Sequence, residues 1–182
     1  MHYVIVPGIG NSDADHWQTL WERRLGQRAT RISVASWEHP DLRDWITGIG
    51  VAADAVNEDP VVVVAHSLGC LAAAHALGER PTPGNIAGAF LAAPPDPTSS
   101  VFPSPAGTFA HAAPAPLGVP TLVVASDDDP YCSRAASQEL ARRWRASWIS
   151  VGPLGHLNVA SGVGRWDEGR QLLTAFVAGT GL

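Results

Sequence analysis

A serine lies where a buried strand is predicted to turn sharply into a helix. Four consecutive valines, Val61 to Val64, favour a fully buried parallel strand, and the alanine-rich segment 71–77 favours a helix. Between them, the small residues around Ser67 leave its hydroxyl at a tight turn that lifts it out of the sheet edge. The alternative is a plain strand-to-helix turn in which Ser67 only caps the next helix. The strand-turn-helix context favours a nucleophilic serine.

A base and an orienting acid follow the serine along the chain. A serine hydroxyl is a poor nucleophile at neutral pH, so it needs both groups within reach. Three aspartates, at 127 to 129, come just after one predicted buried strand, and His156 lies in a glycine-containing loop after the next strand. Because the carboxyl ends of parallel strands meet at one edge of a sheet, we expect these groups to lie near Ser67.

The choice among the carboxylates depends on the loop that carries them. Asp129 is the predicted partner of the histidine, because Pro130 keeps it extended before the next helix begins. Adjacent carboxylates repel one another, so Asp127 and Asp128 are predicted to serve the turn instead. Asp96, after the preceding strand, is a competing acid.

Acyl transfer also requires hydrogen-bond donors for the developing oxyanion. The backbone N–H of Leu68 is one candidate, and the N–H of Ile9, between two glycines after the first strand, is the other. The loop at 7–11 also fits a simple tight turn. It does not match a dinucleotide-binding fingerprint, because Asp13 stands where the last glycine is required.

Three further residues are candidates for the substrate pocket. His16 follows the first strand's loop and can brace that loop or contact substrate. Phe102 and Phe109 lie in the proline-rich connection from Pro94 to Pro120, where they can line a pocket or pin the loop to the core. His66 is expected to pack away from the nucleophile.

Short apolar strands alternate with longer amphipathic segments, a pattern typical of a mostly parallel sheet with helices on both faces. We expect one α/β domain over residues 1–182, with a six-stranded parallel sheet of order 2-1-3-4-5-6 and no large cap. The strands are predicted at approximately His2 to Val6, Arg31 to Ala35, Val61 to Ala65, Ile86 to Ala92, Thr121 to Ser126 and Trp148 to Val151. The helices are predicted at approximately Asp13 to Leu25, Leu42 to Val56, Leu68 to Gly78, Ser133 to Arg145 and Trp166 to Ala178.

The composition argues against several classes of function. A net charge of −5, without a run of basic residues, argues against a nucleic-acid partner. No apolar run reaches the roughly 20 residues needed to span a bilayer, and residues 1–8 do not resemble a signal sequence, so we expect a soluble cytoplasmic protein without a membrane partner. Cys70 and Cys132 are expected to be free thiols, either buried or accessible beside the site. No metal and no cofactor are predicted.

Five separate motifs resemble the small, cap-less α/β-hydrolases typified by retinoblastoma-binding protein 9 and the YdeN-like proteins. The resemblance spans nearly the whole chain. It implies an α/β-hydrolase fold and a serine hydrolase activity, with Ser67, Asp129 and His156 as nucleophile, acid and base. The motifs are Val6-Pro7-Gly8, Asp15-His16-Trp17 with Trp21, Ala65-His66-Ser67-Leu68-Gly69-Cys70, Ser126-Asp127-Asp128-Asp129-Pro130-Tyr131-Cys132, and Gly155-His156-Leu157-Asn158 leading to Gly162-Val163-Gly164-Arg165-Trp166.

The predicted reaction is acyl transfer from a small ester, or secondarily an amide, to water through an acyl-enzyme on Ser67. The short connection 94–120 suggests a shallow site for small acyl groups rather than long lipids, and whether it gates the site stays open. The rival hypothesis is a non-catalytic binding protein on the same frame, with some of the seven tryptophans forming a partner surface.

Overall fold

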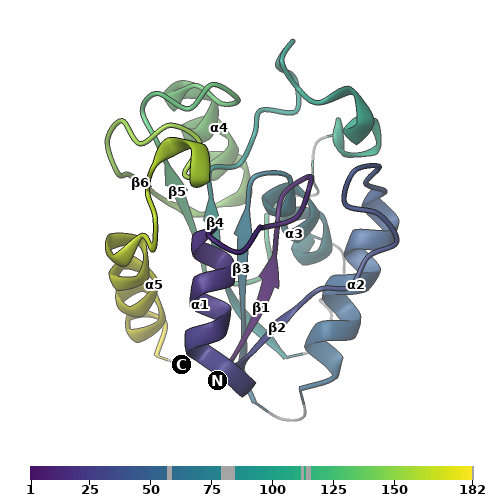
Figure 1. Cartoon of the computed structure of the whole chain (residues 1–182), viewed down its shortest axis with the longest axis vertical. Coiled ribbons are helices and arrows are strands. Elements are labelled where there is room, and N and C mark those ends of the chain that lie inside the picture. Colours follow the sequence, from purple (N-terminus) through teal and green to yellow (C-terminus); the bar gives the residue numbers. More distant parts are fainter. Residues whose placement is uncertain (57–58, 79–84, 112, 114–115, 182) are drawn as a thin grey trace.

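Six parallel strands form a single sheet in the computed structural model, which describes residues 1–56, 59–78, 85–111, 113 and 116–181 (Figure 1). The strand order is β2-β1-β3-β4-β5-β6, as the sequence predicts. β1 and β3 are in register from His2 opposite Val61 to Val6 opposite Ala65, so their carboxyl ends lie side by side. The strands are β1 (His2–Val6), β2 (Ala29–Arg31), β3 (Val61–His66), β4 (Ile86–Ala92), β5 (Thr121–Ala125) and β6 (Ser147–Ser150).

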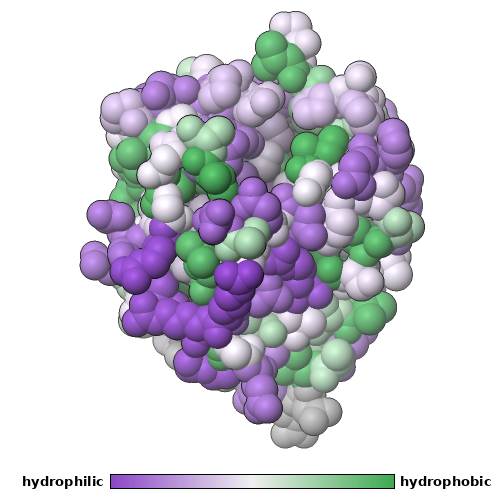
Figure 2. Space-filling model, in the orientation of Figure 1, coloured by the Kyte–Doolittle hydropathy of each residue, from purple (hydrophilic) through white to green (hydrophobic). Residues whose placement is uncertain are grey.

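Helices cover both faces of the sheet and create two apolar cores. One core contains residues of α2, α3 and α4, and the other contains residues of α1 and α5. Figure 2 shows hydrophilic residues gathered over the outer side of α1, whose Trp17 and Trp21 are buried. The helices are α1 (Trp17–Leu25), α2 (Leu42–Asp54), α3 (Leu68–Gly78), α4 (Arg134–Trp144) and α5 (Asp167–Gly179), with 3-10 turns η1 (Gly26–Arg28), η2 (Ser104–Phe109) and η3 (Val159–Ser161). None of the helices in the described part of the chain has the length and apolar character that crossing a membrane requires.

The connection from β3 to α3 is a sharp turn at Ser67. All six residues of β3 are buried, and Ser67 adopts a left-handed backbone conformation with φ of 53°. That conformation costs a residue with a side chain about 1–2 kcal/mol, which the packing around the turn must offset. α3 packs directly on the end of β1, because a Cβ at Gly69 would lie only 2.4 Å from the carbonyl oxygens of Val6 and Pro7. Glycine is therefore required there for the turn to form.

The second strand and the first helix begin two or more residues away from their predicted starts. The second strand spans Ala29–Arg31 rather than 31–35. Beyond it, the chain packs closely on α2, since a Cβ at Gly48 would lie 2.8 Å from the carbonyl oxygen of Ser33. The first helix begins at Trp17 rather than Asp13. The Asp13 carboxylate accepts hydrogen bonds from the backbone N–H groups of residues 15 and 16, and this turn precedes the helix.

The proline-rich connection after β4 contains more structure than its sequence predicts. It includes the turn η2 at Ser104–Phe109, although residues 112, 114 and 115 of the predicted loop lie outside the described residues. Phe109 is fully buried against Trp45, with ring centroids 5.3 Å apart. Phe109 therefore anchors this connection to α2.

Candidate active site

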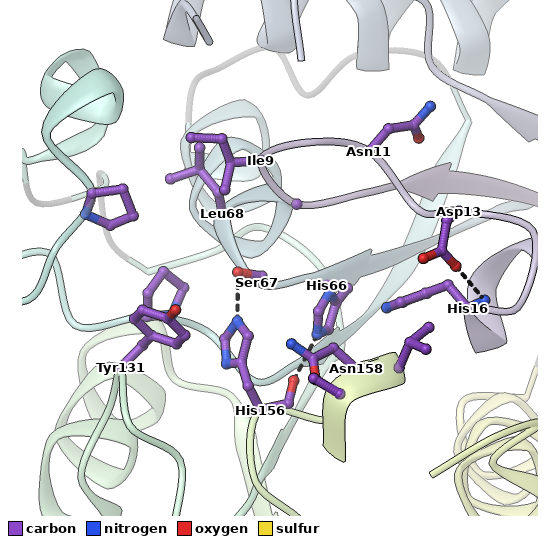
Figure 3. A pocket seen from close by; sticks show the side chains of 15 residues that line it. Ile9, Asn11, Asp13, His16, His66, Ser67, Leu68, Tyr131, His156 and Asn158 are labelled. Carbon is purple, nitrogen blue, oxygen red and sulfur yellow. Dashed lines mark hydrogen bonds between the residues drawn. The ribbon is translucent and has the colours of Figure 1, made fainter. Parts of the chain in front are cut away.

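Ser67, His156 and Asp129 form one hydrogen-bonded series at the carboxyl edge of the sheet (Figure 3). The His156 Nε2 atom lies 2.7 Å from the Ser67 Oγ atom, and its Nδ1 atom lies 2.9 Å from both carboxylate oxygens of Asp129. All three residues are buried. A carboxylate on Nδ1 keeps the proton on that nitrogen, which leaves Nε2 free to accept the serine proton.

Asp129 is the one of the three adjacent aspartates that contacts His156. Asp127 instead pairs with Arg134 at 2.8 Å, and Asp96 accepts hydrogen bonds from Thr98 in its own turn.

Asp128 fixes the loop that carries His156 without contacting the imidazole. Its Oδ1 atom accepts hydrogen bonds from the Gly155 N–H at 2.7 Å and from the Ser126 hydroxyl at 2.8 Å. These two hydrogen bonds lower the pKa of Asp128. Asp127 and Asp128 therefore fix the two loops, whereas Asp129 faces the imidazole.

The loop that carries His156 is held by three ring N–H groups. His66 donates its Nε2–H to the carbonyl oxygen of His156 at 2.9 Å, Trp17 donates to that of Leu157 at 2.8 Å, and Trp21 donates to that of Arg165 at 2.8 Å. The donors come from the end of β3 and from α1, whereas the acceptors follow β6. The position of the imidazole therefore depends on elements from both halves of the chain.

His66 does more than the packing role that its sequence position predicts. Its side chain is buried, yet it also lines the cavity above Ser67. Burial lowers the pKa of His66 well below its ordinary value, and the neighbouring imidazoles of His156 and His16 lower it further. His66 is therefore neutral at neutral pH, and it does not place a positive charge beside His156.

Two backbone N–H groups are available to an oxyanion. Ile9 and Leu68 line the same cavity as Ser67. Within the described part of the chain, neither N–H donates to a protein acceptor. Leu68 is also the first residue of α3, where unpaired N–H groups and the helix dipole favour negative charge. Both predicted donors thus have the chemistry that an oxyanion hole requires.

The cavity above Ser67 has a volume of about 550 Å³ and two different ends (Figure 3). Ile9, Leu68, Pro95, Pro103 and Tyr131 form an apolar end. The Tyr131 ring meets the His156 ring edge to face, with centroids 4.6 Å apart. On the other side of Ser67, the polar end contains Asn11, Asp13, His16 and Asn158. Val159 and Ala160, which follow Asn158 in the sequence, also line the cavity.

Of the three residues predicted to line the pocket, the structure places His16 in the cavity lining but neither phenylalanine. His16 lines the cavity and also caps α1, because its Nδ1 atom accepts the Gln18 N–H at 3.2 Å. Phe109 lies in the core, and Phe102 packs against that core without being among the described residues that line the cavity. The expectation that both phenylalanines line the pocket is therefore wrong, since prolines at 95 and 103 take that place.

Both thiols are buried beneath the site. Burial raises the pKa of the Cys70 thiol well above its ordinary value, and burial together with nearby carboxylates raises that of Cys132 to about 12. Both therefore behave as small apolar residues rather than reactive neighbours of Ser67. In the described ranges, no cluster of three or more His, Cys, Asp or Glu side chains is arranged to hold a metal ion.

The sequence matches a family model described as serine hydrolase over residues 3–175. The chain belongs to the serine hydrolase family. The structure of this serine hydrolase resembles that of a YdeN-like hydrolase from Pectobacterium atrosepticum, at 34% sequence identity and a TM-score of 0.85, over 98% of this chain and 91% of the other. No curated protein sequence matches it significantly.

More distant structures share the fold of this serine hydrolase. The YdeN protein of B. subtilis has 22% identity and a TM-score of 0.83, over 98% of this chain and all of the other. A protein described as a non-heme bromoperoxidase, BpoC from Mycobacterium tuberculosis, has 13% identity and a TM-score of 0.70, over 98% of this chain and 92% of the other. At these identities, the similarity concerns the α/β-hydrolase architecture.

Several residues that line the cavity of the serine hydrolase were not predicted from its sequence. Asn11, Asp13, Tyr131 and Asn158 line the cavity without having been predicted there. Tyr131 follows the acid by only two positions, so its place beside the predicted acid was a usable signal. Asn11 has a positive φ of 67°, and asparagine after a glycine-rich loop is the signal that marks such a turn.

Proposed function

We propose that this serine hydrolase cleaves small esters through a Ser67-His156-Asp129 triad and an acyl-enzyme intermediate. The observation that supports it most directly is the unbroken hydrogen-bonded series from Ser67 to Asp129. A cavity of about 550 Å³ whose mainly apolar lining includes several polar side chains suits a small substrate better than a long lipid.

The proposed reaction proceeds in two halves. Ser67 Oγ attacks the ester carbonyl carbon while its proton passes to His156 Nε2, and the N–H groups of Ile9 and Leu68 stabilise the oxyanion. Collapse of this intermediate breaks the bond to the alkoxide, which takes the proton from His156 and leaves as alcohol. Asp129 stabilises the imidazolium in both steps. Water then attacks the acyl carbon of the acyl-enzyme while His156 takes its proton. Collapse of this second intermediate breaks the bond between the acyl carbon and Ser67 Oγ, His156 returns the proton to Ser67 Oγ, and the carboxylic acid leaves.

A non-catalytic binding protein on the same fold is the rival hypothesis. It would use exposed tryptophans as a partner surface. None of the seven tryptophans is exposed, and Trp17 and Trp21 donate hydrogen bonds to the histidine loop. The tryptophans therefore favour the hydrolase over the binding protein.

A fluorophosphonate probe tests the proposal. We expect the wild-type protein to gain one adduct by intact mass, the Ser67→Ala variant to gain none, and the exposed-serine control Ser100→Ala to react like wild type. Short-chain 4-nitrophenyl esters should be hydrolysed, with kcat lower by roughly 10⁴-fold or more in Ser67→Ala. A folded wild-type protein that neither reacts with the probe nor hydrolyses these esters would overturn the proposal. Faster cleavage of the matching 4-nitroanilides would instead indicate an amidase.

A further inference from the structure

His16 presents an unused hydrogen-bond donor to the polar end of the cavity. Only 5% of the residue is exposed, and its Nδ1 atom accepts the Gln18 N–H at the start of α1. A neutral imidazole has one acceptor nitrogen and one donor nitrogen, so this cap places the proton on Nε2. Within the described residues, Nε2 has no hydrogen-bond partner and is not among the polar atoms sealed from solvent.

The ring of His16 is held in a fixed direction. Its centroid lies 4.8 Å from that of His66 and 5.4 Å from that of Trp17. The ring centroid of His66 in turn lies 5.1 Å from that of His156. The three imidazoles therefore form a row from the polar end of the cavity to the proposed base. In Figure 3 the ring of His16 extends toward that of His66. A substrate arm lying along the row passes the His16 donor.

The charge around this donor restricts what it can bind. Burial lowers the pKa of His16 to about 4, so the ring is a neutral donor at neutral pH. The carboxylate of Asp13 lies exposed at the same end of the cavity, and its Oδ1 atom accepts the N–H groups of Asp15 and His16. A neutral donor beside a carboxylate favours an uncharged oxygen acceptor over a second carboxylate.

We propose that His16 is a specificity-determining residue whose Nε2–H binds an uncharged oxygen acceptor, such as an ether or carbonyl oxygen, in one arm of the substrate. The other arm is a small apolar group that packs against Ile9, Leu68 and Tyr131. The inference rests on the proposed ester hydrolysis at Ser67, and it narrows the substrate class to small esters with one polar and one apolar arm.

The test separates the donor of His16 from its role as a helix cap. In His16→Asn, the amide oxygen can still accept the Gln18 N–H, but the side chain no longer reaches into the cavity as a donor. His16→Asp offers the same cap as a second variant if the first does not fold. His39→Asn is the matched control, because His39 is exposed and outside the cavity lining.

The substrates are two series of esters based on hexanoate and on hexyl alcohol. In each series, one methylene at successive positions is replaced by an ether oxygen, and kcat/KM is divided by that of the unsubstituted ester. Comparing this ratio between wild type and variant cancels the intrinsic reactivity of each ester. We expect one position in one series at which His16→Asn lowers the ratio by about 10-fold, while His39→Asn leaves it unchanged.

Two other outcomes would overturn the inference in distinguishable ways. Equal ratios in wild type and His16→Asn at every position of both series, with fluorophosphonate labelling intact, would remove His16 from recognition and leave the ester hydrolysis standing. Absence of both labelling and hydrolysis in the folded wild-type protein would refute the proposed function and this inference together.

Discussion

His66 donates its Nε2–H to the carbonyl oxygen of His156 at 2.9 Å, which joins the residue before the nucleophile to the proposed base. The bond is buried and spans 90 residues of sequence. It fixes the main chain of His156, while Asp129 fixes its ring. His66 is therefore a positioning residue that acts on the imidazole through its backbone.

Replacing His66 should lower catalytic activity when the new side chain cannot donate a hydrogen bond to His156. His66→Leu leaves the buried carbonyl oxygen of His156 without a partner, and we expect kcat/KM on a 4-nitrophenyl ester to fall by about 10- to 100-fold. His66→Gln restores an N–H at similar reach and should recover most of the activity. Steady-state kinetics with a melting curve for each variant make the measurement. Equal activities of the two variants would contradict the positioning role.

Gly8 is required because the proposed nucleophile, Ser67, lies against it. A Cβ at this position would lie 2.9 Å from Cβ and 3.3 Å from Oγ of Ser67. Ser67 cannot easily yield, since its turn is already in a left-handed conformation. We expect Gly8→Ala to lower the rate of fluorophosphonate labelling by about 100-fold.

The control for Gly8→Ala is Gly107→Ala. A Cβ at Gly107 meets nothing within 4 Å, so this variant should label at the wild-type rate and keep its melting temperature. If Gly8→Ala were labelled at the wild-type rate, the turn that carries Ser67 would have to shift enough to accommodate the added methyl group.

The sheet and the reacting groups follow patterns that are local in sequence. The valine run at 61–64 indicates a buried strand, and right-handed crossovers between parallel strands leave few strand orders to consider. Since polar groups after such strands meet at one edge, the sequence alone was enough to select Ser67, Asp129 and His156, which the structure brings together.

The supporting hydrogen bonds and the lining of the cavity depend on long-range contacts that no local sequence pattern predicts. Trp17 lies at a spacing typical of core residues, yet its indole N–H reaches the carbonyl oxygen of Leu157, 140 positions away. Phe109 is an aromatic residue in a proline-rich loop, a setting that fits a pocket and a core anchor equally well. Only the packing against Trp45 decides between them. His16 combines a cap and a cavity donor, and sequence gives no way to separate these roles.

The buried histidines should make stability depend on pH in a defined window. The pKa of His16 falls from its ordinary value of 6.5 to about 4 on folding, mainly by burial and also through Arg31 and His156, with Asp13 opposing the change. The unfolded chain therefore binds a proton between these pH values that the folded protein does not. The histidine's stability contribution is complete above pH 6.5 and is lost as the pH falls toward 4.

Urea unfolding at pH 7 and pH 4.5 measures this effect. A pKa difference of this size corresponds to about 3 kcal/mol in the free energy of unfolding when the pH drops across the whole window. His16→Asn should reduce the decline by most of that amount, whereas exposed His39→Asn should not change it. An identical decline in wild type and His16→Asn would mean that His66 and other groups account for the pH dependence. Burial lowers the pKa of His66 in the same direction.

The same substitution, aspartate to asparagine, should lower kcat strongly at Asp129 and only slightly at Asp128. In Asp129→Asn, an amide N–H facing the ring favours the tautomer with the proton on Nε2, which cannot accept the Ser67 proton, and we expect kcat to fall by about 10⁴-fold. In Asp128→Asn, the remaining amide oxygen can still accept the Gly155 N–H, so kcat should stay within several-fold of wild type. Ester hydrolysis by the two folded variants decides the assignment. If Asp128→Asn were the inactive variant, the acid would act through the backbone of the histidine loop rather than through the imidazole.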